Sequence, residues 1–555
     1  MNFLSHHKFK PICCFPILAL FLYILPVNIF AQIHQEWVQR YNGIINSADN
    51  GLSAVTSDAS GNIFVTGSVT TGNSGYDFAT IKYNSSGTQL WIKYYNGTGN
   101  GNDIPSAIAS DNSGNIYVTG QSNGSGSNEN YATIKYNPSG DQQWVQIFQG
   151  PSGYSMPTAI CVDAAGNLYV TGYDLSIAGS QHTGLDYLTI KYNANGVQQW
   201  VQRGNPGIYN DDKAYALAVD ASGNVYVTGG SSQTGGYSIA TIKYNSSGVE
   251  QWLKIFDGPA HNYDEGYSIA VNNGGDVYVT GYVSGIGTGD DYVTLKYNSA
   301  GVQQWVNYYN GPGNGNDIPV SVRLDVSGNV FVTGTSMGTG TDYDFCTIKY
   351  TPSGVQQWIA RYNSTDNDFE SPSAMIVDTG GVYITGSSLR SGHGKNFETV
   401  KYGFNGVLLW NIEYNGTGNG DDAANALALI GNDIYVGGTS WGNGTGNNFA
   451  LVKYSPLIGI KRIGEMVPAE NNLMQNYPNP FNPVTNIRFD ISKNSFVNLK
   501  IYNILGAEIK TILNEQLAPG KYSVEFDGSN LASGTYFYRI NTQDFSQTMK
   551  MEILK

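Results

Sequence analysis

The chain has 555 residues and a net charge of −14, and only 13% of its residues are charged, against roughly 25% in ordinary soluble domains. Glycine accounts for 69 residues and aromatic residues for 13%, which is typical of turn-rich β structure. The acidic balance excludes a nucleic-acid-binding surface of the usual basic kind, and the many aromatic residues exclude a disordered chain.

The first 31 residues have the layout of a secretory signal peptide. Two lysines precede an apolar stretch from Pro11 to Ala31, no acidic residue occurs, and cleavage is predicted after Ala31. A retained membrane anchor is the alternative, but Pro16 and Pro26 interrupt the apolar run and favour cleavage. No later segment reaches the roughly 20 apolar residues that span a bilayer, so we expect no transmembrane segment in the mature chain.

The middle of the chain repeats one unit eight times. Eight tryptophans recur at spacings of 52 to 56 residues, and eight Lys-Tyr pairs follow the same period. A period near 53 residues is typical of β-propeller blades. The tryptophans, which we expect to dock one blade on the next, are Trp37, Trp91, Trp144, Trp200, Trp252, Trp305, Trp358 and Trp410.

One unit is predicted to form four strands, which in the second unit are 106–111, 115–120, 131–136 and 143–148. The first is small and apolar, as an innermost strand must be, and the fourth carries the tryptophan. Asp-x-Ser-Gly-Asn and Asn-x-x-Gly sequences between the strands have hairpin-turn chemistry. The fold class is therefore all-β.

The two ends of the repeat region complement each other. The first unit opens with a fourth strand, Gln35–Tyr41, and the last unit ends with a third strand, Phe449–Tyr454. Pairing of these strands completes the last blade and removes an exposed sheet edge. The prediction is an eight-bladed β-propeller of four-stranded blades over residues 32–456, closed by the N-terminal strand.

The repeat resembles a known family. Asp-x-Ser-Gly-Asn-x-Tyr-Val-Thr-Gly, followed by Thr-Ile-Lys-Tyr-Asn-x-x-Gly-x-x-x-Trp, is similar to the β-propeller repeat of bacterial secreted proteins abbreviated SBBP. The likeness covers residues 36–454. The family's name implies seven blades, whereas this sequence contains eight units in register.

A different module follows the repeats. Residues 457–470 lack aromatic residues and blade spacing and are interpreted as a linker. Residues 471–555 begin with a proline-rich entry and continue with strand patterns separated by turns such as Asn503-Ile-Leu-Gly506. This pattern predicts a small Ig-like antiparallel β-sandwich.

This module strongly resembles the type A C-terminal sorting domain of the type IX secretion system. The resemblance rests on a sorting motif that consists of Asn476, Pro478, Asn479, Pro480, Phe481 and Gly534. The resemblance implies that the type IX machinery is a partner and that the protein crosses the periplasm. It further implies that the protein is secreted or displayed on the outer cell surface.

A polar residue recurs four positions before the small residue of each innermost strand. Six of these residues are acidic: Asp103, Asp212, Asp264, Asp317, Glu370 and Asp422. A ring of carboxylates at the channel mouth would suit Ca²⁺ or a polar ligand, and no other cofactor is assigned. The alternative is that each carboxylate caps its own strand. A feature that recurs in nearly every blade favours this structural role.

The charge of this region suggests a role for the lysine of each repeat. Residues 1–31 carry +2 and residues 471–555 carry +1, which leaves −17 for the middle of the chain. A lysine in every repeat of so acidic a domain is expected to bond to an aspartate or a carbonyl within or between blades. These residues are Lys82, Lys135, Lys191, Lys243, Lys296, Lys349, Lys401 and Lys453.

Two classes of function remain open. The sequence lacks sialidase-type Asp boxes and histidines at metal-ligand spacing, so it favours a surface-displayed binding or structural propeller with an extracellular glycan or protein ligand. The alternative is an extracellular carbohydrate-active hydrolase or lyase that uses carboxylates at the channel mouth. A carboxylate pair outside the repeat pattern would favour the enzyme, and the candidates are Glu265 beside Asp264 and Asp211 beside Asp212.

Overall fold

The computed structural model describes residues 33–555 except 44–50, 73–74, 125–127, 179–180, 208–210, 457–460, 465–466, 518 and 530. The predicted signal peptide lies outside these residues. The described residues form strands and turns and contain no helix, which agrees with the predicted all-β class. The chain divides into two compact units, of which one is Ala31–Ile458 and the other contains Gly459–Lys555.

The described part of Ala31–Ile458 contains eight four-stranded antiparallel sheets. Seven of them consist of four consecutive strands. The first three of these seven are β2 (Gly51–Ser57), β3 (Ile63–Thr70), β4 (Tyr76–Tyr83) and β5 (Gln89–Tyr95); β6 (Ile104–Ser110), β7 (Ile116–Asn123), β8 (Glu129–Tyr136) and β9 (Gln142–Phe148); and β10 (Ser155–Val162), β11 (Leu168–Ala178), β12 (Gln181–Tyr192) and β13 (Gln198–Gly204).

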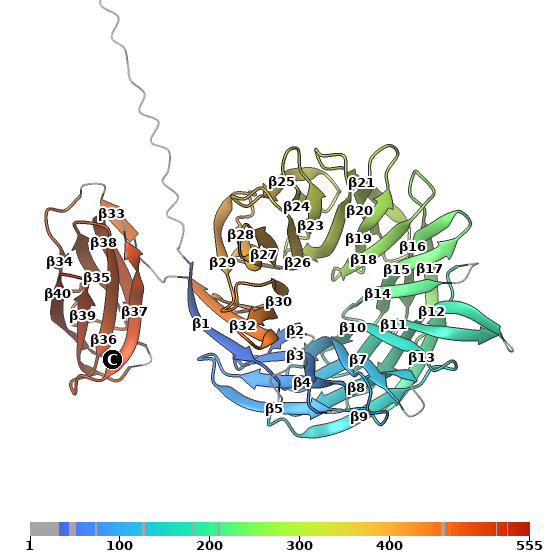
Figure 1. Cartoon of the computed structure of the whole chain (residues 1–555), viewed down its shortest axis with the longest axis horizontal. Coiled ribbons are helices and arrows are strands. Elements are labelled where there is room, and N and C mark those ends of the chain that lie inside the picture. Colours follow the sequence, from blue (N-terminus) through green and yellow to red (C-terminus); the bar gives the residue numbers. More distant parts are fainter. Residues whose placement is uncertain are drawn as a thin grey trace, which may run out of the picture. The chain divides into compact units, whose positions relative to one another are not determined.

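The next four sheets continue this pattern. They are β14 (Asp212–Val219), β15 (Val225–Gln233), β16 (Gly236–Tyr244) and β17 (Glu250–Phe256); β18 (Asp264–Val271), β19 (Val277–Ser284), β20 (Asp290–Tyr297) and β21 (Gln303–Tyr309); β22 (Asp317–Leu324), β23 (Val330–Met337), β24 (Tyr343–Tyr350) and β25 (Gln356–Tyr362); and β26 (Glu370–Asp378), β27 (Gly381–Arg390), β28 (Gly394–Tyr402) and β29 (Leu408–Tyr414). In Figure 1 the sheets follow one another around a common centre, with the first strand of each sheet innermost.

The eighth sheet joins the two ends of the repeat region. It has the order β1-β32-β31-β30, and its strands are β30 (Asp422–Ile430), β31 (Asp433–Gly442), β32 (Gly446–Pro456) and the N-terminal β1 (Ile33–Tyr41). The predicted pairing of the N-terminal strand is confirmed, because Gln35 lies opposite Tyr454 and Tyr41 opposite Phe449.

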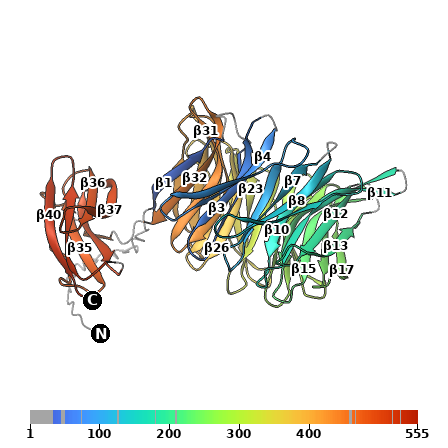
Figure 2. The ribbon, with the colours of Figure 1, turned by 90° about the horizontal axis from the view of Figure 1, so that it is seen from below.

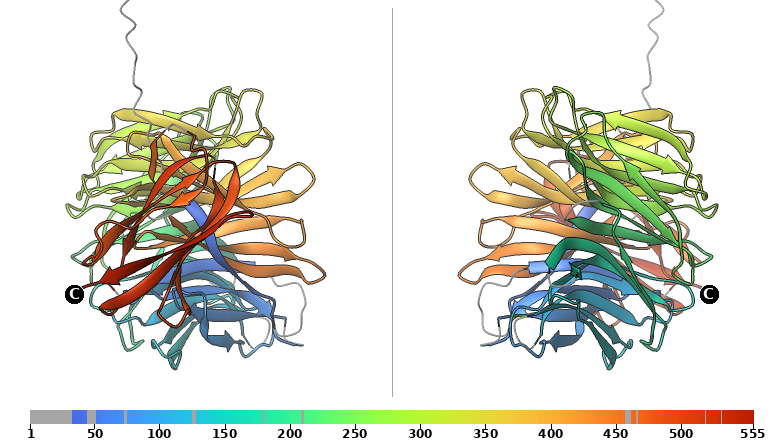
Figure 3. Two further views of the ribbon diagram at one scale, coloured as in Figure 1. Left: turned by 90° about the vertical axis from the view of Figure 1, so that its left-hand side faces the viewer. Right: turned by 90° about the vertical axis from the view of Figure 1, so that its right-hand side faces the viewer.

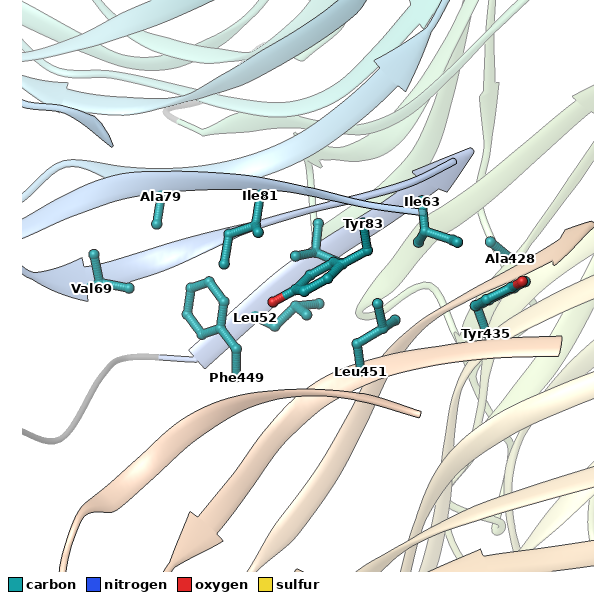
Figure 4. Packing of buried hydrophobic residues seen from close by; sticks show 11 residues of the cluster. Leu52, Ile63, Val69, Ala79, Ile81, Tyr83, Ala428, Tyr435, Phe449 and Leu451 are labelled. Carbon is teal, nitrogen blue, oxygen red and sulfur yellow. The ribbon is translucent and has the colours of Figure 1, made fainter. Parts of the chain in front are cut away.

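The eighth sheet also packs against the first. Leu52, Ile81 and Tyr83 of the first sheet share a buried cluster with Phe449 and Leu451 of the eighth, and Figure 4 shows these side chains facing one another between the two sheets. Similar clusters lie between the other neighbouring sheets, which stand side by side when the unit is viewed from other directions (Figures 2 and 3).

The repeated tryptophan and lysine of one sheet bind the same carbonyl of the next. Trp91 Nε1 donates to the Pro138 carbonyl at 3.2 Å, and Lys82 Nζ donates to the same oxygen at 3.0 Å. Gly140, in the same turn as Pro138, has a φ of +85°, and a Cβ there would lie 2.9 Å from the Trp91 ring. Glycine is therefore required both by the left-handed backbone and by the close approach of the indole.

Within the described residues, this double contact joins seven pairs of neighbouring sheets. The other shared carbonyls belong to Ala194, Ser246, Ser299, Pro352, Phe404 and Ser85. The Ser85 carbonyl accepts hydrogen bonds from Trp37 of β1 and Lys453 of β32, so the N-terminal strand takes part in the same contact. The expectation that these lysines bond between blades is thus confirmed at seven positions, and the eighth, Lys401, lies over the Tyr383 ring at 4.5 Å.

The C-terminal unit has two four-stranded sheets, with orders β33-β38-β35-β34 and β37-β36-β39-β40. Their strands are β33 (Lys461–Gly464), β34 (Asn472–Leu473), β35 (Val484–Ile491), β36 (Ser495–Tyr502), β37 (Glu508–Leu517), β38 (Gly520–Asp527), β39 (Gly534–Asn541) and β40 (Ser546–Ile553). An Ig-like arrangement of these sheets stays a prediction.

Part of the predicted linker belongs to this second unit. Lys461 and Arg462 pair with Ser523 and Tyr522 of β38, so the interpretation of 457–470 as a linker throughout is wrong. The strand has four residues and no aromatic side chain, which is why its sequence lacks the usual strand pattern.

Candidate functional site

The six predicted ring residues lie at the start of the first strand of their sheets and are fully buried. Asp317 shows the common arrangement: its Oδ2 accepts from the Gly311 amide at 2.6 Å and its Oδ1 from the Met337 amide at 3.1 Å. One donor lies in the loop before the strand and the other on the neighbouring strand. The carboxylate therefore ties a loop to its own sheet.

Asp103, Asp212, Asp264 and Asp422 repeat this pattern at distances of 2.5–3.2 Å. Glu370 instead accepts from the Ser388 hydroxyl at 3.0 Å. Within the described ranges, no three His, Cys, Asp or Glu side chains are placed to hold a metal ion. The geometry favours strand capping over a ligand ring, and calcium binding by these residues stays a prediction.

Burial raises the pKa of all six carboxyl groups, and for Asp212 and Asp264 it raises the pKa to about 6. The backbone N–H donors oppose this shift because they stabilise the charged form. Glu398, buried in the seventh sheet beside Arg390, has a pKa raised by burial to about 7.

The free energy of unfolding is expected to fall as the pH rises from about 4 to about 7. Carboxyl groups of the unfolded chain titrate near pH 4, so the folded state holds more protons in this window. Each of Asp212 and Asp264 then costs up to about 3 kcal/mol at pH 7. Thermal melts at pH 5 and pH 7 measure this, and Asp212→Asn combined with Asp264→Asn should reduce the slope. A melting temperature that rises with pH across this window contradicts it.

A row of five tyrosines lies on the third, fourth and fifth sheets and directly before β10, and four of the five depart from the repeat. We call it the tyrosine belt, and it consists of Tyr154, Tyr173, Tyr215, Tyr267 and Tyr282, all half-buried. Tyr215 and Tyr267 occupy a first-strand position that the other sheets fill with Ser53, Ser106, Thr158, Val320, Ser373 and Asn425. Tyr173 and Tyr282 occupy a second-strand position that the other sheets fill with Ser68, Gln121, Gly230, Thr335, Ser387 and Thr439.

Glu265 lies at the centre of the belt. Its Oε1 accepts from the Tyr215 hydroxyl at 3.3 Å and its Oε2 from the Tyr267 hydroxyl at 3.0 Å. The Tyr215 and Tyr267 ring centroids are 5.5 Å apart, and those of Tyr267 and Tyr282 are 5.6 Å apart. A Cβ on Gly230 would lie 3.0 Å from Glu265 Cγ, so the glycine at this position of the fourth sheet leaves room for the carboxylate.

At the other end of the belt, two tyrosines meet at Met156. The hydroxyls of Tyr154 and Tyr173 both contact the Met156 sulfur, at 3.8 and 3.1 Å. Burial raises the pKa of Tyr173 to about 12, and Tyr154 adds to this shift. Burial is also the largest cause of the raised pKa of Tyr215, to which Glu265 and then Tyr173 add. The phenols therefore stay protonated and act as hydrogen-bond donors at neutral pH.

The belt combines broad aromatic faces with hydroxyl donors and one carboxylate acceptor. Tyrosine supplies large contact area with few rotatable bonds, which is why it is enriched in binding surfaces. Sequence reasoning singled out Glu265 but missed the tyrosines. An alignment of the eight units against each other would have found four of them, because Tyr173, Tyr215, Tyr267 and Tyr282 replace mostly small or polar residues.

In each of the two carboxylate pairs considered for an enzyme, the two side chains lie in different environments. Asp264 and Asp212 are buried with both oxygens bonded to backbone amides, while Glu265 faces the tyrosines. Asp211 Oδ1 accepts from the Leu185 amide at 3.2 Å. Neighbouring residues on a strand point to opposite faces, so neither pair joins two carboxylates in one site.

A cavity of about 400 Å³ lies between the third and fourth sheets, where Cys161, Asp163 and Asp220 line it. Both aspartates are occupied by their own turns: Asp163 accepts from Asn167, and Asp220 accepts from Asn224. Burial raises the pKa of Cys161 to about 11, so its thiol is neutral. These features give the cavity no group that is free for chemistry.

Two of the predicted sorting residues are buried in the C-terminal unit, and the other four, Pro478, Asn479, Pro480 and Gly534, are exposed. Asn476 is buried, and its side-chain amide donates to the Pro478 carbonyl at 3.1 Å and to Thr485 Oγ1 at 3.0 Å. Phe481 is buried against Phe526, and its amide donates to the Glu552 carbonyl. Asn479 Oδ1 accepts from the Glu552 amide, Gly534 begins β39, and Pro478 and Pro480 follow cis peptide bonds.

Exposed apolar side chains occur both within the span of the motif, where Tyr477 is exposed, and in a turn outside it. Leu505 is 86% exposed and Ile504 is 69% exposed in the turn that Asn503 and Gly506 close. Asn476 and Phe481 thus help to hold the fold, while other motif residues and the turn present apolar side chains to solvent.

Comparison with known proteins gives two family matches. Residues 475–554 match the secretion system C-terminal sorting domain, and residues 90–126 match the SBBP β-propeller repeat. The sorting domain indicates export through the type IX secretion system to the cell surface or outside. The described residues contain no helix suited to crossing a membrane.

Three solved structures are similar at 12% identity. PorZ, a surface component of the type IX secretion system of Porphyromonas gingivalis, has a TM-score of 0.32, with 90% of this chain and 74% of PorZ covered. The polysaccharide lyase Uly1 has a TM-score of 0.37, covering 75% and 92%, and the β-xylosidase RS223 has 0.26, covering 57% and 98%. At these scores no function is transferred. Comparison with curated proteins found no match. The chain therefore combines an SBBP-type β-propeller repeat with a C-terminal sorting domain of the type IX secretion system.

Proposed function

We propose that the chain is an exported binding protein, in which residues 32–456 form an eight-bladed β-propeller and residues 471–555 direct it through the type IX secretion system. The eight four-stranded sheets and the seven tryptophan–lysine contacts between neighbours support this architecture. The signal peptide of residues 1–31 takes the chain to the periplasm, from which the sorting domain leads it to the surface.

Closure by the N-terminal strand is part of this proposal. Two observations support it: β1 pairs with β32 along its whole length, and Trp37 of β1 donates to the Ser85 carbonyl of the first sheet at 3.3 Å. The last sheet then docks on the first by the same contact that joins the other sheets. The edge of β32 is then covered by β1, and the eighth sheet has the same four strands as the others.

The tyrosine belt is the surface on which the propeller binds its ligand. The observation that carries this assignment is the break in the repeat: three adjacent sheets place aromatic residues where the others have small or polar ones. Structural needs are the same in every sheet, so a cluster confined to three of them is not explained by the scaffold. The ligand is extracellular, because the sorting domain exports the chain.

A binding screen of the mature chain against immobilised extracellular glycans and proteins tests the assignment. Tyr215→Ala combined with Tyr267→Ala is expected to weaken binding of the retained ligand at least about thirtyfold, because aromatic side chains at the centre of an interface contribute about 2 kcal/mol or more. Trp441→Ala is the matched control, since it removes an exposed aromatic side chain from the eighth sheet. Equal binding by the double variant, or an equal loss in the control, would exclude the belt as the binding surface.

A further inference from the structure

The tyrosine belt is negatively charged. Glu265 lies at its centre, Glu129 adds to the raised pKa of Tyr154 and Tyr173 at one end, and Asp290 adds to that of Tyr282 at the other. Among the described residues, none of these three carboxylates forms an ion pair. The central strands of the belt, β14 and β18, carry one basic residue, Lys213. It occupies the position in β14 that Glu265 occupies in β18.

These groups are suited to a cation. Each oxygen of Glu265 accepts one tyrosine hydroxyl, and a carboxylate oxygen has a second lone pair for another donor. The faces of aromatic rings attract ammonium groups, and the attraction grows where water is excluded. Half-buried rings around a carboxylate therefore provide two attractions for the same charge.

We propose that the belt binds a glycan that carries free amino groups; this assignment rests on the proposed binding function. The aromatic faces pack against the apolar faces of the sugar rings, and Glu265 accepts from an ammonium group. An amino sugar is favoured over a lysine-rich peptide because its ammonium group sits on a rigid ring. Ordering a lysine side chain costs up to about 2 kcal/mol of rotamer entropy, which the sugar avoids.

Two oligosaccharides with the same backbone, one with free amines and one with acetylated amines, test this proposal. The mature chain is titrated with β-1,4-linked glucosamine hexamer and with its fully N-acetylated counterpart, at a pH at which the amines are protonated. We expect the glucosamine hexamer to bind at least about tenfold more tightly, and the difference to shrink with added salt. Glu265→Gln should weaken its binding about tenfold, because the charged partner is lost. Glu250→Gln, on the exposed outer strand β17, is the matched control and should leave binding unchanged.

Equal affinity for the two hexamers, or no effect of Glu265→Gln, overturns the assignment. Tighter, Glu265-dependent binding of poly-lysine overturns it in favour of a peptide ligand. Failure of both hexamers, while another ligand still binds in a manner that depends on Tyr215 and Tyr267, overturns the amino-glycan assignment and leaves the binding function standing.

Discussion

Removal of residues 33–43 is expected to lower the free energy of unfolding of the propeller by more than about 5 kcal/mol. The deletion exposes the full edge of β32 and removes Trp37 from the aromatic contact with Tyr435. Truncation of a large aromatic side chain alone costs about 3–5 kcal/mol, and the lost strand pairing adds to it. Lys453 also loses its 2.7 Å ion pair with Glu36 and keeps the one with Asp433.

Thermal melting and size-exclusion chromatography measure the result. A 5 kcal/mol loss corresponds to a fall of roughly 6 °C for a unit of this size, and the exposed edge should produce oligomers. A synthetic peptide of residues 33–43 should restore both properties, because it re-forms the missing strand. Trp37→Phe is the control that keeps the strand and should lose much less. An unchanged melting temperature after the deletion would contradict closure by this strand.

Truncation after Pro456 is expected to abolish delivery to the cell surface while the propeller stays folded. The cut falls close to the boundary between the two compact units, and it removes the whole segment that matches the sorting domain. The truncated chain should accumulate in the periplasm, as cell fractionation and surface protease digestion would detect. Its purified form should melt as cooperatively as the full chain.

Transfer of the module provides the converse experiment. Residues 457–555 fused behind a folded periplasmic reporter should carry that reporter to the surface. This range includes β33, whose pairing with β38 makes it part of the module. Surface delivery of the truncated chain, or retention of the fused reporter in the periplasm, would contradict the sorting role.

Much of the fold was predictable because the repeat makes each unit a test of the others. The strands predicted for the second unit agree with β6 to β9 within three residues at either end, and the unmatched fourth strand at the N-terminus led directly to its pairing with β32. The four-residue β33 and the two-residue β34 escaped prediction because such short edge strands have no periodic pattern.

The sequence repetition that made the fold easy to predict made the candidate site harder to find. Repetition drew attention to Asp103 and its equivalents, and the structure gives Asp103 one backbone amide in the preceding loop and one on the neighbouring strand. Four of the five belt tyrosines are departures from the repeat, spread over positions as distant in sequence as Tyr173 and Tyr282. Only the packing of the fourth sheet against the fifth brings Tyr215 and Tyr267 onto opposite oxygens of Glu265.

The most direct test compares the belt with the repeated carboxylates in one titration. The ligand retained in the binding screen is titrated into wild type, into Tyr215→Ala with Tyr267→Ala, and into Asp103→Asn with Asp317→Asn. We predict at least about a thirtyfold loss of affinity in the tyrosine variant. The carboxylate variant should keep its affinity but melt at a lower temperature, because asparagine offers one acceptor oxygen to the two amides that each aspartate binds. Loss of binding in the carboxylate variant, with wild-type affinity in the tyrosine variant, would contradict the account.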